Sequence, residues 1–129
     1  MINSSSFTIK NNTIANFTGE SGESGDHWTI GAVGSDGAIA SGIYSINLSN
    51  SNITNNEIIQ IKGGKGGTGG FPGSDTYAGN GGKAYGIYLE FSVNNNITNN
   101  TISQIEGGTG GTGGRTSLYT AYAGTGGLG

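Results

Sequence analysis

A repeat of 44 residues runs through this chain of 129 residues and constrains its fold more than any other feature. The register slips by one residue near the end, where the glycine that matches Gly81 is Gly126 and not Thr125. Copies in near-strict register stack on one another in the same orientation, so function is to be sought in the array. Isoleucine, asparagine and glycine all keep the period, as in Ile9, Ile53 and Ile97 or Gly19, Gly63 and Gly107.

The composition suits a thin repeat architecture better than a thick globular core. Glycine accounts for 28 of the 129 residues, charged residues for 10% and apolar residues for 32%. Without a period, this glycine content would indicate disorder. The net charge is −3 and the five basic residues are scattered, which argues against binding to nucleic acid. The sequence has no cysteine and no apolar run long enough for a transmembrane segment.

The first half of each period predicts short strands with corners. The segments at about 1–18, 42–62 and 86–106 are rich in β-branched residues and asparagine and lack a helical pattern. Asn55 and Asn56 mark a corner, because asparagine tolerates left-handed backbone angles. Ile87, Leu89, Phe91 and Val93 alternate with polar residues, which predicts a half-buried strand. We expect stacked ladders of structural residues at Asn12, Asn56 and Asn100, at Ile14, Ile58 and Ile102, and at Tyr44 and Tyr88.

The stretch GIYLEFSVNNNITNNTISQI carries a family resemblance. It resembles a coil of the right-handed parallel β-helix repeats in periplasmic copper-site maturation proteins and in archaeal surface proteins. Pectate lyases share that fold. The resemblance covers about half of each period and implies a right-handed parallel β-helix, but it implies no particular function.

The second half of each period is glycine-rich and spans about 19–41, 63–85 and 107–129. Glycine at every third residue fits an extended helix with three residues per turn, and such helices pack closely where no Cβ intervenes. We expect each repeat to form a hairpin of two such legs, stacked into a polyproline-II or polyglycine-II side layer. The alternative is a flexible glycine linker. Packing inside the layer is expected at Gly22, Gly66 and Gly110, and at Gly25, Gly69 and Gly113.

Candidate sites outside the ladders are few. His27 has no arranged nucleophile or carboxylate pair around it, so we expect no catalytic residues, metal site or cofactor. The acids do not recur as a calcium-binding set, although Asp36 with backbone carbonyls stays open as a calcium ligand. Aromatic residues at the hairpin tips, Trp28, Phe71 and Tyr119, suit stacking on glycans or contact with a protein.

The function that fits these observations is structural. We expect an extracellular filament, sheath or surface stalk, with self-association or a longer tandem array as its partner. No segment has the pattern of a polar cap, which favours bare ends that stack on copies. The alternative is a cell-surface adhesin that binds glycans or protein through its aromatic tips, and a carbohydrate-active enzyme ranks third. Each period forms either one layer or two, with a spacing of about 4.8 Å or twice that.

Overall fold

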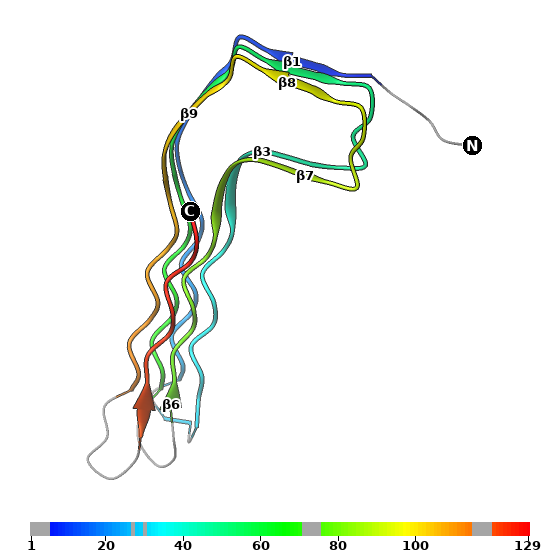
Figure 1. The fold of residues 1–129 in the computed structure, drawn as a ribbon. Coiled ribbons are helices and arrows are strands. Elements are labelled where there is room, and N and C mark those ends of the chain that lie inside the picture. The colour runs from blue at the N-terminus through cyan, green and yellow to red at the C-terminus, as the bar shows by residue number, and fades with distance from the viewer. Residues whose placement is uncertain (1–5, 27, 30, 71–75, 115–119) are drawn as a thin grey trace. The chain divides into compact units, whose positions relative to one another are not determined.

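The computed structural model describes residues 6–26, 28–29, 31–70, 76–114 and 120–129 (Figure 1). Within these ranges the chain is all-β and contains no helix, as the sequence predicts. Accordingly, none of the described segments is a helix able to cross a membrane. The strands are β1 (Thr8–Lys10), β2 (Thr13–Thr18), β3 (Ala40–Ile46), β4 (Asn52–Thr54), β5 (Glu57–Lys62), β6 (Thr76–Tyr77), β7 (Ala84–Glu90), β8 (Asn96–Thr98), β9 (Thr101–Glu106) and β10 (Ala121–Tyr122).

Strands pair between repeats and not within them. β4 lies between β1 and β8 in one sheet, and both pairs are parallel. The register places Ile53 opposite Ile9 on one side and opposite Ile97 on the other. Further sheets have the orders β2-β5-β9, β3-β7 and β10-β6. Neighbouring repeats bond to each other directly, with partners 44 residues apart. Each 44-residue period therefore contributes one rung to the stack of strands, and not two.

The chain divides into two compact units, and each contains a part of every repeat. The first unit comprises Met1–Phe17, Ser41–Ile61 and Tyr85–Ile105. The second comprises Thr18–Ala40, Lys62–Ala84 and Glu106–Gly129. We refer below to repeat 1 (residues 1–41), repeat 2 (42–85) and repeat 3 (86–129).

The core of the first unit belongs to the middle repeat. Ile53, Ile58 and Ile61 are fully buried, because a neighbouring repeat covers them on each side. Ile102 holds the same phase as Ile58 in repeat 3 but is 45% exposed, since only one neighbour covers it. Gly42 is required beside this core, because a Cβ there would overlap a methyl group of Ile58.

Corners between strands use left-handed backbone angles. Asn11, Asn55 and Asn99 have φ angles of 59°, 55° and 55°, which confirms the corner predicted at Asn55. A second corner at Asn16, Gln60 and Gln104 was not predicted; its φ angles are 60°, 58° and 55°.

The predicted half-buried strand through Phe91 and Val93 is wrong at its end. β7 stops at Glu90, and Phe91 is 77% exposed with φ at 49°. The left-handed backbone at Phe91 turns the chain and breaks the alternation of inward and outward side chains. Val93 is also exposed and lies in an isolated bridge to Ser49.

Candidate functional site

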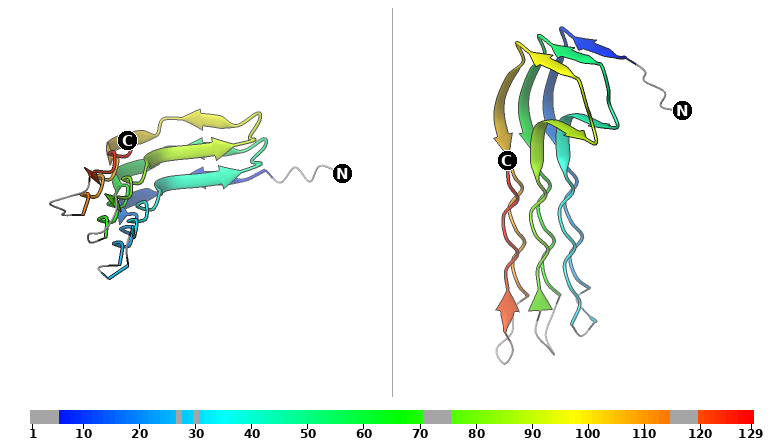
Figure 2. Two further views of the ribbon diagram at one scale, coloured as in Figure 1. Left: turned by 90° about the horizontal axis from the view of Figure 1, so that it is seen from below. Right: turned by 45° about the vertical axis from the view of Figure 1, so that its right-hand side comes forward.

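The second unit consists of glycine-rich legs, and they carry the candidate functional surfaces. Each repeat supplies an outgoing leg (19–26, 63–70 and 107–114) and a return leg (32–40, 76–84 and 121–129). Figure 2 shows them as pairs of winding traces that run side by side. Along the legs the sequence advances in triplets whose first two positions are mostly glycine and whose third position varies.

First positions of the triplets join legs of the same kind. In the outgoing legs, the N–H of Gly22 donates to the carbonyl of Lys65 (2.7 Å), and that of Gly66 donates to Thr109 (2.9 Å). In the return legs, Gly81 donates in the same way to Thr125 (2.8 Å). The acceptor is each time a third-position carbonyl of the next repeat, so the outgoing legs form one layer and the return legs form another.

Second positions of the triplets join the two layers. The N–H of Gly82 donates to the carbonyl of Gly64 within repeat 2 (2.8 Å). The N–H of Gly108 donates across the repeat boundary to the carbonyl of Gly82 (2.8 Å). A central leg therefore bonds to its own layer and to the facing layer, which satisfies its backbone groups as folding requires.

The predicted glycine-packing positions lie between the two legs of one repeat. A Cβ on Gly22 would overlap the carbonyl of Ser35. The predicted set Gly66, Gly110, Gly25, Gly69 and Gly113 behaves alike, since in each case a Cβ would come within about 3.0 Å of return-leg backbone or of an outgoing leg. Glycine is needed here because the backbones approach each other too closely for a side chain.

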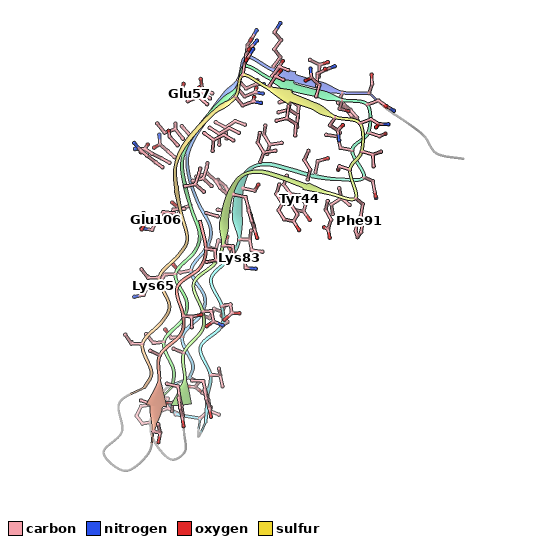
Figure 3. All side chains as sticks on the ribbon, in the orientation of Figure 1. Tyr44, Glu57, Lys65, Lys83, Phe91 and Glu106 are labelled. Carbon is pink, nitrogen blue, oxygen red and sulfur yellow. The ribbon has the colours of Figure 1, made fainter. Side chains whose placement is uncertain are left out.

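Third positions carry the side chains that cover the outer faces. Figure 3 shows Lys65 on the outgoing layer and Lys83 on the return layer, pointing to opposite sides. On the outgoing layer, Thr68 donates to Ser24 through its hydroxyl (2.8 Å). Near the start of that layer, Lys62 pairs with Glu106 at 3.0 Å, but both side chains are about half exposed, so the pair stabilises little.

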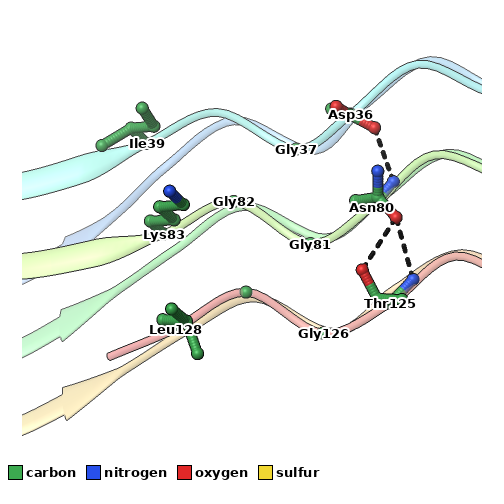
Figure 4. A pocket seen from close by; sticks show the side chains of 11 residues that line it. Asp36, Gly37, Ile39, Asn80, Gly81, Gly82, Lys83, Thr125, Gly126 and Leu128 are labelled. Atoms are coloured by element: carbon green, nitrogen blue, oxygen red, sulfur yellow. Dashed lines mark hydrogen bonds between the residues drawn. The ribbon is translucent and has the colours of Figure 1, made fainter.

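A groove of about 410 Å³ follows the outer face of the return layer (Figure 4). One rank of side chains crosses it: the N–H of Asn80 donates to the Asp36 carboxylate (2.6 Å), and Thr125 donates to the Asn80 amide oxygen through its N–H (3.0 Å) and its hydroxyl (2.9 Å). The Asp36 carboxylate thus accepts a hydrogen bond from the next repeat. Among the described residues, no three or more His, Cys, Asp or Glu form a cluster able to hold a metal. Ile39, Lys83 and Leu128 form the next rank along.

The edge of this unit on repeat 1 differs from every internal boundary. Second-position glycines such as Gly64 and Gly67 face the preceding outgoing leg, where a Cβ would overlap the carbonyls of Glu20 and Glu23. Repeat 1 itself has Glu20 and Glu23 at these same positions, and both are exposed. The return leg follows the same rule at two positions: Ser35 and Ala38 stand where repeat 2 has Gly79 and Gly82.

Ser35 also satisfies one backbone N–H of this edge. In repeat 2, the N–H of Gly67 donates to the carbonyl of Ser35 in the preceding repeat (2.8 Å). In repeat 1, the corresponding N–H of Glu23 donates to the Ser35 hydroxyl instead (2.7 Å). The expectation that no segment forms a polar cap is therefore wrong for the second unit: repeat 1 carries its cap inside the glycine legs.

The edge on repeat 3 lacks these features. Within the described residues, the N–H groups of Gly110 and Gly126 have no acceptor, and the carbonyl of Gly127 has no donor. A Cβ on Gly126 would meet only the carbonyl oxygen of Gly108, at 3.7 Å, which is an ordinary contact. The glycine backbone of this edge is bare.

The predicted asparagine ladder lies in the first unit and is continuous. Asn56 is buried, and its side-chain oxygen accepts from the N–H and the side-chain amide of Asn12 (3.1 and 2.9 Å). Its own amide donates to Asn100 (2.9 Å) and to the carbonyl of Ile9 (3.0 Å). Apart from a bond from the Asn12 amide to the Lys10 carbonyl (3.2 Å), the side-chain hydrogen bonds of the ladder join one repeat to the next. The ladder isoleucines occupy a common phase, with Ile58 buried, Ile14 half-buried and Ile102 exposed.

Aromatic residues stack in both units. In the first, the rings of Tyr44 and Tyr88 are 5.4 Å apart and nearly parallel. The carboxylate of Glu90, aided by partial burial, raises the pKa of Tyr88. In the second, Tyr77 and Tyr122 stack at 4.6 Å, and the interplanar angle is 5°.

The predicted tip residues are described only in part. The Trp28 side chain is 89% exposed. The backbone N–H of Trp28 donates to the carboxylate of Asp26, two residues earlier (3.0 Å). Phe71, Tyr119 and His27 lie outside the described residues.

Comparisons with known proteins are sparse. No family model matches the chain, and no curated protein matches it. Among solved structures it is similar to a springtail antifreeze protein from Granisotoma rainieri, a bundle of nine polyproline type II helices. The identity is 20% over 99% of this chain and 94% of that chain, and the TM-score is 0.35. A similarity of this size does not establish a shared fold.

Proposed function

We propose that the chain is a non-catalytic structural protein of the cell exterior, an element of a filament, sheath or surface stalk. In this proposal the first unit is a right-handed parallel β-solenoid, as the resemblance of its sequence to β-helix repeats implies. The second unit is a side layer of polyproline-II-like glycine legs. Rigidity along the stacking direction is the property that the chain supplies.

One observation carries the proposal: the contacts that hold each repeat are contacts with the next repeat. Ile53 pairs in register with its counterparts on both sides, and the Asn56 side chain bonds to both neighbours. In the second unit, the first-position N–H groups of the glycine legs likewise donate to the next repeat. Stability of such arrays comes from nearest-neighbour interfaces, so length can be added without changing the architecture.

Electron cryomicroscopy of the protein from its native source tests the proposal. Extended filaments or stalks with a strong repeat at about 4.8 Å would support it, because that is the spacing of stacked strands. Discrete particles without this repeat would count against a structural role and would favour binding.

A second candidate function rests on the stacked pair Tyr77 and Tyr122 and on the exposed Trp28. Flat aromatic rings on a rigid support suit stacking on sugar rings or contact with a partner protein. The adhesin proposal predicts that Trp28→Ala with Tyr122→Ala abolishes binding on a glycan array. Tyr44→Ala serves as the control, since Tyr44 stacks in the other unit. No binding by the unsubstituted chain to glycans or cell surfaces would remove this candidate.

A further inference from the structure

We propose that the two edges of the glycine unit have opposite roles in assembly. The edge on repeat 3 is a docking surface for a further glycine hairpin stacked in the same orientation, and the edge on repeat 1 rejects one. This inference rests on the proposed stacked array. It names the partner that the array accepts: a hairpin with glycine at the second position of its triplets on both legs.

The internal boundaries define what docking requires. Repeats 1 and 2 meet as repeats 2 and 3 do, with Gly22 donating to Lys65 in one case and Gly66 to Thr109 in the other. The next donor in this series is the N–H of Gly110, which has no acceptor among the described residues. The edge of repeat 3 thus presents the groups with which the edge of repeat 2 binds its neighbour.

Gly126 gives independent evidence for an absent neighbour. Its counterpart Gly81 must be glycine, because a Cβ there would overlap the carbonyl of Gly108 in the next outgoing leg. At Gly126 no described residue imposes this demand. Glycine has an entropic cost on ordering, so its presence is explained if another outgoing leg packs against it.

Repeat 1 cannot be that neighbour. Suppose that a second copy docked its repeat 1 on this edge. Its Glu20 and Glu23 would then face repeat 3 as Gly108 and Gly111 face repeat 2, and at those positions a Cβ overlaps the backbone of the preceding leg. The two carboxylates would also be buried without cations, which is strongly unfavourable. Ser35 and Ala38 would obstruct the return layer in the same way. Copies of this chain therefore do not stack head to tail.

The test converts the rejecting edge into an accepting one. The variant Glu20→Gly/Glu23→Gly/Ser35→Gly/Ala38→Gly restores the internal pattern on repeat 1. By analytical ultracentrifugation and electron microscopy, we expect the unsubstituted chain to stay monomeric and this variant to form linear assemblies of many times the monomer mass. The matched control Ser21→Gly/Ser24→Gly/Asp36→Gly/Ile39→Gly adds four glycines to the same legs at outward third positions and should remain monomeric.

A second substitution locates the contact. Adding Gly126→Ala to the assembling variant should abolish assembly, because the new methyl group would overlap the docked leg, whereas inside the chain it makes only an ordinary contact with the Gly108 carbonyl oxygen at 3.7 Å. Assembly that persists with Gly126→Ala would overturn the proposal. So would an unsubstituted chain that forms head-to-tail filaments, or that dimerises through its repeat 3 edges.

Hydrogen exchange separates failure of this inference from failure of the proposed function. If the variant Glu20→Gly/Glu23→Gly/Ser35→Gly/Ala38→Gly stays monomeric while its Gly64, Gly67 and Gly82 amides exchange slowly, the docking rule is refuted and the stacked array stands. Fast exchange at these amides in every variant would mean that the legs do not stack, and the proposed structural role would fail with the docking rule.

Discussion

The pair Gly81 and Gly126 offers a sharp test of the glycine packing, because the two residues hold the same phase in adjacent repeats. In Gly81→Ala the new Cβ overlaps the Gly108 carbonyl, so the legs must separate. Overpacking of this kind costs about 1–3 kcal/mol. Separation also weakens the bonds from Gly81 to Thr125 and from Gly108 to Gly82, both 2.8 Å, at about 0.5–1.5 kcal/mol each.

One opposing effect is common to both substitutions. Replacing glycine by alanine restricts the unfolded chain and stabilises the folded one by about 0.4–1 kcal/mol where the backbone tolerates it. Gly81→Ala should therefore lower the free energy of unfolding by about 1–5.5 kcal/mol, whereas Gly126→Ala should raise it by up to about 1 kcal/mol. At about 4 °C per kcal/mol, the two melting temperatures should differ by roughly 10 °C or more.

Thermal unfolding followed by circular dichroism measures this difference. Hydrogen exchange at Gly108 provides the local readout, because its N–H donates a hydrogen bond to the Gly82 carbonyl across the disturbed contact. Equal shifts for the two substitutions, in either direction, would refute the reasoning, since they would mean that Gly81 is not packed against another leg.

Three further predictions concern the first unit. Asn56→Ala should lower the free energy of unfolding, measured by urea titration, by about 2–4 kcal/mol, because its buried side chain makes several hydrogen bonds. Asn12→Ala, at the exposed end of the ladder, should lower it by less than half as much. Ile58→Ala should cost about 2–5 kcal/mol by the same assay, since the fully buried side chain would leave a cavity; a loss below 1 kcal/mol would contradict the packing. Glu90→Gln should move the titration of Tyr88, followed by phenolate absorbance, to lower pH, because it removes the charge that most raises this pKa; an unchanged midpoint would contradict that cause.

Features that depend on local chemistry could be predicted from the sequence. The period sets which strands pair, so Ile53 had to lie between its two counterparts. Asparagine at a fixed phase predicted the left-handed corner at Asn55. The corner at Gln60 carried a weaker signal, because only repeat 1 has asparagine at this phase, Asn16, and glutamine is an unusual residue for that backbone. Phe91 was misassigned because its left-handed turn ends an alternating pattern of side chains.

The cap of the glycine unit had a signal in the sequence, but a count of glycines does not show it. Repeat 1 keeps the first-position glycines, such as Gly22, and replaces the second-position ones with Glu20 and Glu23. Only the packing shows that a Cβ at a second position would face the preceding repeat. A Cβ at a first position would face the return leg of the same repeat on an outgoing leg, and the next repeat on a return leg. A side chain at a second position therefore excludes a neighbour without disturbing its own hairpin.

The rule for second positions of the triplets connects stability with assembly. Repeat 3 retains Gly126 and bare glycine backbone on an edge that nothing in the described chain covers. Unpaired backbone groups and missing side chains both favour contact with another leg, while Glu20 and Glu23 prevent it at the opposite edge. A stack built under this rule adds glycine hairpins at the repeat 3 edge alone. The number and order of its repeats are then set by which hairpins carry side chains at second positions, and not by a general tendency of glycine-rich chains to associate.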